Sequence, residues 1–231
     1  IKNAQEAGIH NISIDLIYGI PSNSSDELQK DLDLATSFGV SHISAYSLTV
    51  EPKTVFSVQK KKGDFVEIPE SAMASAFQQV RDYLEATGYE GYETSNFAKD
   101  EQYSVHNTSY WQQESYLGVG PSAHSFNGHS RQWNVSNNAK YITSGHFLAE
   151  KEELSPADQL NEYVMVRLRT KWGIDLSFVR RSFQQLNQPY PEKEFQSWIK
   201  DSYAHLVGEN LILKGEGKLI ADRLSSDIFV V

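Results

Sequence analysis

The stretch NISIDLIYGIP, residues 11–21, decides the fold of this chain of 231 residues. Apolar side chains occupy every second position from Ile12 to Leu16, which is typical of a strand covered on one face. The Gly-Ile-Pro sequence that follows ends the strand, because proline lacks the N–H group that a strand ladder needs. We therefore predict a strand at 11–17.

A helix and a second strand are predicted to follow. Ser24 and Glu27 form a capping-box pattern, in which each side chain bonds a backbone N–H at the helix N-terminus. Apolar residues then recur at helical spacing up to Gly39, a typical helix-ending residue. A second strand is predicted at 42–48. Strand, helix and strand with short joints form a βαβ unit, so we expect parallel strands and an α/β fold.

The middle of the chain is less regular. Residues 51–68, which include the lysines at 60–62, are predicted to form an irregular solvated loop. A helix with an apolar stripe begins at Pro69. Residues 95–135 are rich in Gly, Asn, Ser, His and aromatic residues, with little periodicity. Long irregular stretches inside a compact domain often carry function, so we expect site loops there.

The last eighty or so residues predict a separate and mostly helical domain. The predicted elements are helices at 155–169, 176–186 and 191–206 and a β-hairpin formed by 211–213 and 218–220. Helices followed by a hairpin are typical of a winged-helix-like domain. We therefore expect residues 1–150 to form one domain with the strands and site loops, and residues 151–231 to form an accessory domain.

The composition excludes several kinds of site. The chain has no cysteine, so it cannot itself supply disulfides, zinc thiolates or the ligands of an iron–sulfur cluster. Its net charge of −9 argues against nucleic acid as a partner, because phosphate contacts need clustered Lys and Arg. No apolar run approaches the roughly 20 residues of a membrane span, and no leader-like segment opens the chain. We expect a cytoplasmic protein, with attachment to the membrane periphery left open.

Two single residues are candidates for chemistry. Asp15 is predicted near the carboxyl end of a parallel strand, where α/β folds bind ligands; capping of a loop is the alternative. His106 opens the sequence HNTSYW and could ligate heme iron, with Tyr110 and Trp111 beside the flat macrocycle. The alternative for His106 is a loop histidine that bonds the backbone.

The sequence YLGVGPSAHS, residues 116–125, imitates a dinucleotide fingerprint through its glycines. No βαβ unit surrounds it and no acidic residue lies about 20 positions further on, so we reject a Rossmann site. Gly118 and Gly120 are better explained by a close approach of the backbone to a ligand or a neighbouring strand. His124 is the second histidine that we consider as a site residue.

Several stretches resemble the oxygen-independent coproporphyrinogen III oxidase family of radical SAM proteins. They are IDLIYGIP at 14–21, the segment 44–52, YETSNFA at 92–98 and LGVGPSAHS at 117–125. The resemblance covers essentially the whole chain. It implies a radical SAM (βα) barrel, of which this chain would be the C-terminal part, followed by an accessory domain.

The resemblance also implies ligands. S-adenosylmethionine would be contacted by Asp15, Thr49 and the backbone around Gly118, Gly120 and His124. The sequence HNTSYW is similar to the family's branch of heme-binding chaperones, which implies heme binding with His106 as iron ligand and Tyr110 and Trp111 in the pocket. The family's [4Fe-4S] cluster is held by cysteines, which this chain lacks.

Two functions from different classes follow from this resemblance. The first is a heme-binding chaperone that delivers heme to an acceptor protein. The alternative is an oxygen-independent coproporphyrinogen III oxidase, inactive in this chain because the cluster-binding half is missing, so whether the intact protein is an enzyme stays open. The predicted strands at 11–17 and 42–48 would lack a neighbour on one side. We therefore expect self-association through an exposed sheet edge.

Overall fold

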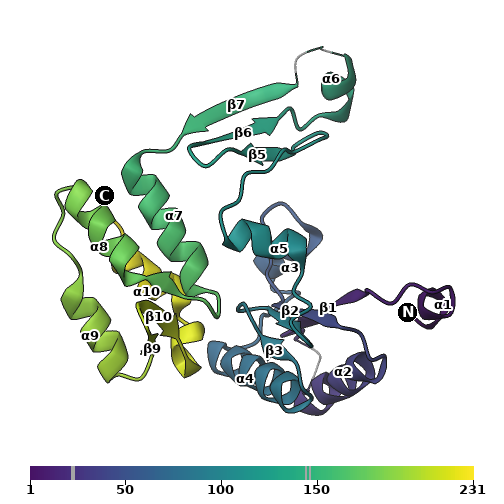
Figure 1. The fold of residues 1–231 in the computed structure, drawn as a ribbon. Helices are drawn as coiled ribbons and strands as arrows, with labels where there is room; N and C mark the ends of the chain where they lie inside the picture. Colours follow the sequence, from purple (N-terminus) through teal and green to yellow (C-terminus); the bar gives the residue numbers. More distant parts are fainter. Residues whose placement is uncertain (22–23, 144, 146) are drawn as a thin grey trace. The chain divides into compact units, whose positions relative to one another are not determined.

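The computed structural model describes residues 1–21, 24–143, 145 and 147–231. By its internal packing the chain divides into two compact units, Ile1–Ser104 and Val105–Val231 (Figure 1). The predicted domain boundary after residue 150 falls inside the second unit. It lies near the change from strand β7 (Leu148–Glu153) to helix α7 (Pro156–Leu168).

The first unit is built on the predicted βαβ element. Strands β1 (Ser13–Tyr18) and β2 (His42–Ser47) pair in parallel, and helix α2 (Ser25–Ser37) joins them. The capping box is present: Ser24 Oγ accepts the Glu27 N–H, and Glu27 Oε2 accepts the Ser24 N–H. The predicted strand, helix and strand are therefore confirmed.

Two short strands complete this sheet. Strand β4 (Asn96–Ala98) pairs antiparallel with β2, and β3 (Glu90–Gly91) pairs antiparallel with β4. The strand order is β1-β2-β4-β3, which leaves β1 as an edge strand among the described residues. The apolar alternation of β1 also has the expected effect: Ile14 packs against the core cluster, whereas Asp15 is exposed.

The core of the first unit lies between the sheet and two helices. Helix α4 (Glu70–Ala86) follows Pro69 as predicted and packs with α2 against the sheet. Fully buried side chains from both helices and from two strands meet there: Leu32, Leu84, Ile43 and Phe97. Full burial of each such side chain stabilises the folded unit by about 1.5–3 kcal/mol. This burial holds the strands in register.

Helix α3 (Val55–Lys62) lies where an irregular loop was predicted. Thr54 Oγ1 accepts the Ser57 N–H at its start, and Gly63 ends it with φ +82°. None of its residues is buried. The prediction was wrong because a helix without a buried face has no apolar stripe to reveal it. The remaining helix of this unit is α1 (Lys2–Glu6).

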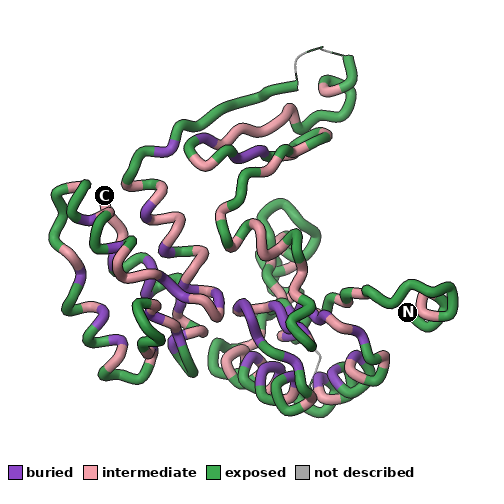
Figure 2. Tube along the Cα trace, in the orientation of Figure 1, coloured by how far each residue is buried: buried purple, intermediate pink, exposed green. Residues whose placement is uncertain are grey.

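The second unit opens with helix α5 (Val105–Trp111), followed by strands β5 (His124–Phe126) and β6 (Ser130–Asn134). Together with β7 these strands form an antiparallel sheet in the order β5-β6-β7, and α6 (Asn138–Thr143) precedes β7. The irregular stretch predicted at 95–135 is therefore partly regular. All six residues of β7 are exposed (Figure 2), so this strand lacks the buried alternation that marks a strand in sequence.

The rest of the second unit is helical with a small sheet. Its further elements are β8 (Ile174–Asp175), α8 (Leu176–Gln185), α9 (Glu192–Lys200), β9 (Ala204–Val207), β10 (Asn210–Leu213), η1 (Gly215–Lys218) and α10 (Ala221–Ser226). Its core includes Leu160, Leu168, Ile174 and Leu211. None of the described helices is long and apolar enough to span a membrane.

The predicted hairpin has a different partner strand. Strand β10 pairs with β9, across a turn formed by residues 208–209, and residues 218–220 belong to no strand. Helix α9 ends at Lys200, six residues before the predicted end, which frees Ala204–Val207 to form a strand. The prediction was wrong because it extended the helix across residues whose strand character depends on pairing with β10.

Candidate functional site

The two candidate S-adenosylmethionine contacts of the first unit are exposed. Asp15 is the third of six residues in β1, so it lies nearer the middle of the strand than the predicted carboxyl end. Thr49 follows β2, and its hydroxyl donates to the Ser47 carbonyl at 3.5 Å. A cavity of about 500 Å³ near the end of β1 is lined by Tyr18, Leu28 and neighbouring residues. Neither Asp15 nor Thr49 lines it.

A buried histidine near Asp15 was missed in the sequence. The ring of His42 hydrogen-bonds the Ser13 hydroxyl at 2.7 Å through Nδ1 and the Tyr92 hydroxyl at 2.8 Å through Nε2. Burial lowers the pKa of His42, while the negative charge of Asp15 acts in the opposite direction. Burial also raises the pKa of Tyr92 to about 12. The chain of bonds therefore holds a neutral imidazole between two hydroxyls.

Helix α5 carries the motif of the candidate iron ligand. His106 and Tyr110 are four residues apart, so they share a helix face, and their rings meet edge to face with centroids 4.9 Å apart. Both side chains are exposed. An exposed imidazole fits the role of an iron ligand, because the metal must reach one of its ring nitrogens.

Trp111 points elsewhere. Its indole Nε1 is buried and has no hydrogen-bond partner among the described residues, and the same holds for Thr108 Oγ1. On a helix, Trp111 and Thr108 are three residues apart and share a face that differs from the His106 face. The structure thus brings Tyr110 together with His106 but does not place Trp111 beside them.

A row of aromatic rings continues from His106 into the sheet. The Tyr110 ring lies 4.8 Å from that of Tyr116, which lies 6.0 Å from that of Phe126 on β5. The Arg131 guanidinium lies over the Phe126 ring at 5.6 Å. We call His106, Tyr110, Tyr116 and Phe126 the aromatic row. A cavity of about 190 Å³ borders the aromatic row, and Tyr116, Phe126 and Gln132 are among the residues that line it.

The glycine-rich sequence before β5 is shaped by its own backbone. A Cβ on Gly118 would collide with the His124 backbone, so the close approach that requires glycine is to a neighbouring strand. Gly120 has φ +110° and open space around its Cα, and its N–H donates to the Tyr141 hydroxyl at 3.2 Å. These residues sit in the second unit, and Asp15 and Thr49 sit in the first.

His124 lies against an indole. Its ring stacks on Trp133 of β6 with centroids 5.6 Å apart and planes tilted by 27°. His124 itself is exposed, so the stacked pair is open to solvent on the imidazole side. An exposed imidazole on an indole can contact a flat ligand ring, but no described contact assigns that ligand.

Sequence reasoning missed Tyr116, Phe126 and Arg131, which extend the site beyond the histidine motif. Tyr116 opens the quoted run 116–125 without being recognised as a site residue, and no local pattern marks Phe126 or Arg131, which meet because β5 pairs with β6. The described residues contain no group of three or more His, Asp or Glu side chains that could hold a metal ion. With no cysteine in the chain, its residues do not fit an iron–sulfur cluster, which needs thiolate ligands.

Comparison with known proteins identifies relatives of this chain. It is 32% identical to the heme chaperone HemW of Bacillus subtilis over 228 residues, which cover 96% of this chain and 60% of that protein. It is 33% identical to HemW of Mycobacterium tuberculosis over 220 residues, 93% of this chain and 54% of that protein. The chain is thus similar to HemW heme chaperones over most of its own length. It spans little more than half the length of these HemW relatives.

The fold of this chain has a solved counterpart. Coproporphyrinogen III oxidase HemN of Escherichia coli, described as a radical SAM enzyme, matches with a TM-score of 0.73 and 19% identity. The match covers 97% of this chain and 56% of the HemN chain, which confirms the expected α/β fold type. No family model matches the chain. The expected resemblance to HemW and HemN proteins is thus confirmed, to HemW by sequence and to HemN by fold.

Proposed function

We propose that this chain is part of a heme chaperone that binds heme and delivers it to an acceptor protein. The observation that carries the proposal is the exposed His106–Tyr110 pair at the start of the aromatic row. In this proposal a nitrogen of His106 binds the heme iron and the Tyr110 ring lies beside the macrocycle. Curated relatives named heme chaperones support it. Trp111 remains the other candidate pocket residue, although its indole Nε1 is buried.

The same proposal includes cofactors that the longer relatives imply. Asp15 and Thr49 of the first unit and Gly118, Gly120 and His124 of the second remain the candidate contacts to S-adenosylmethionine. A [4Fe-4S] cluster would need cysteines outside this chain. We further propose that the first unit belongs to a (βα) barrel and the C-terminal elements to a winged-helix-like domain, and that the protein is cytoplasmic or attached to the membrane periphery.

A coproporphyrinogen III oxidase is the second candidate, because the solved structure with the similar fold is such an enzyme. The two candidates differ in what happens to the porphyrin. A chaperone retains bound heme unchanged until an acceptor takes it, whereas an oxidase converts coproporphyrinogen. Heme uptake without turnover by the full-length protein favours the chaperone, and conversion of coproporphyrinogen favours the oxidase.

Titration of this chain with hemin tests the proposed ligand. We expect His106→Ala to weaken hemin binding by about 10- to 100-fold and to shift the Soret band, by analogy with effects measured at other metal sites. The matched control is His129→Ala, because the His129 side chain is exposed in the same unit and lies outside the aromatic row. Equal affinities and spectra for the two variants would exclude His106 as the ligand.

A further inference from the structure

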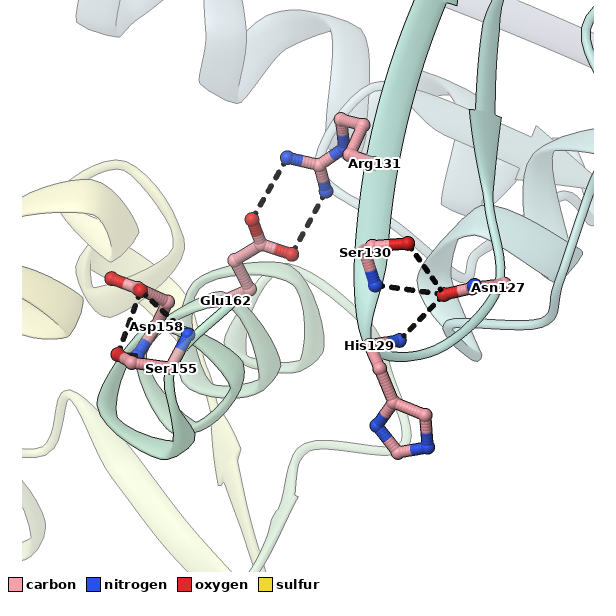
Figure 3. A network of polar contacts seen from close by, with 7 residues as sticks. All are labelled: Asn127, His129, Ser130, Arg131, Ser155, Asp158 and Glu162. Carbon is pink, nitrogen blue, oxygen red and sulfur yellow. Dashed lines mark hydrogen bonds and ion pairs between the residues drawn. The ribbon is translucent and has the colours of Figure 1, made fainter. Parts of the chain in front are cut away.

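One ion pair ends the aromatic row. Arg131 Nη1 donates to Glu162 Oε1 at 2.9 Å and Nη2 donates to Oε2 at 2.8 Å, so the two side chains are joined by a bidentate pair (Figure 3). Arg131 comes from β6 and Glu162 from α7. Their side chains are 30% and 21% exposed, so the pair is shielded without being sealed from solvent. A ligand from solution can therefore reach the guanidinium.

The surroundings of Arg131 connect it to the candidate heme site. Its guanidinium lies over the Phe126 ring, the last member of the aromatic row. Glu162 first, and the Tyr116 hydroxyl after it, raise the pKa of Arg131. The fixed positive charge thus borders two of the four aromatic residues and is balanced by the single carboxylate that pairs with it in Figure 3.

The chemistry of the cargo suggests what this pair does. Heme carries two propionates, and each ends in the same carboxylate group as a glutamate side chain. Arginine binds such a group through two parallel N–H donors, with a geometry that lysine cannot reproduce. A propionate could therefore take the place of Glu162 on Arg131, and the electrostatic cost of the exchange is that of leaving the Glu162 carboxylate without its partner.

We propose that Arg131 recognises a carboxylate of the porphyrin and that Glu162 holds the guanidinium in position until the ligand arrives. This inference rests on the proposed heme-binding function and adds to it a residue that selects for carboxylate-bearing porphyrins. The exchange releases Glu162, so ligand binding would loosen the link between β6 and α7. In this proposal neither residue binds the iron, and Arg131 would act on a propionate of the macrocycle.

The test compares hemin with hemin dimethyl ester, whose propionates are blocked. We expect Arg131→Gln to weaken hemin binding about 10-fold, the size expected for a hydrogen bond to a charged group. Glu162→Gln should tighten hemin binding, because the competing carboxylate is gone. Binding of the ester should be the same in the unaltered chain and in both variants. Circular dichroism and thermal unfolding of each variant show whether the fold is kept.

The matched control breaks a different Arg–carboxylate pair of the same unit. Arg169 Nη1 donates to Asp222 Oδ1 at 2.9 Å, and Asp222→Asn should leave the binding of both probes unchanged. Arg131→Lys, which keeps the charge, should recover only part of the affinity. Equal loss of hemin and ester binding in Arg131→Gln, or weaker hemin binding in Glu162→Gln, would overturn the inference. Failure of the unaltered chain to bind either probe would overturn the proposed function and this inference with it.

Discussion

His42 shows how a single residue makes the stability of the first unit depend on pH. The side chain is 3% exposed and lies between the hydroxyls of Ser13 and Tyr92. Burial lowers its pKa, so the folded chain binds a proton to His42 less readily than the unfolded chain. Because the unfolded state binds more protons in this range, the free energy of unfolding rises with pH.

This leads to a prediction at the residue scale. His42 contributes fully to the free energy of unfolding above the ordinary histidine pKa of about 6.5. This contribution is lost as the pH falls from there through the lowered pKa of His42 in the folded chain. We would measure the free energy of unfolding in urea at neutral and at mildly acidic pH. The decrease between the two pH values should be smaller in His42→Gln than in the unaltered chain. His10→Gln is the control, since His10 is exposed. The same pH dependence in both variants and the parent would contradict the assignment.

At the scale of elements, α2 depends on its N-terminal cap. The Ser24 hydroxyl accepts the Glu27 N–H, one of the backbone groups that a helix leaves unpaired at its start. We expect Ser24→Ala to lower the free energy of unfolding by about 1 kcal/mol, as measured for such caps. Ser75→Ala is the control, because Ser75 lies exposed inside α4 and alanine favours helices. Equal stability of the two variants in urea would show that the capping box contributes nothing.

At the scale of the whole molecule, the exposed edge of β1 is the feature with the largest consequence. Among the described residues β1 pairs only with β2, and its Ile17 side chain is 54% exposed. An edge strand with unpaired backbone groups and an exposed apolar side chain tends to pair with another chain. We therefore propose that β1 is where a further strand adds, from a longer form of the protein or from a second copy.

Sedimentation tests this proposal. The isolated chain should associate as its concentration rises, beyond the 26.1 kDa of the monomer. Ile17→Lys should shift the equilibrium towards monomer, because a lysine on an edge strand opposes pairing. Adding the segment of a longer HemW relative that this chain does not cover should compete with self-association. A monomer at every concentration, unaffected by that segment, would rule out β1 as an association edge.

The elements that sequence alone predicted share a local cause. The alternation in β1, the capping box of α2 and the capped start of α7 at Ser155 depend on residues within a few positions of each other. Local spacing was therefore sufficient for the βαβ unit and for the first C-terminal helix. Helix α5, which brings the His106 and Tyr110 rings together, was not predicted, and His106 as iron ligand stays a prediction.

Tertiary structure decided what depends on segments that are distant in sequence. The aromatic row exists because Tyr116 contacts both Tyr110 of α5 and Phe126 of β5, and the Arg131–Glu162 pair exists because β6 and α7 meet. No spacing along the chain encodes these contacts, since each requires the backbone to bring its two segments together in space before the side chains can meet.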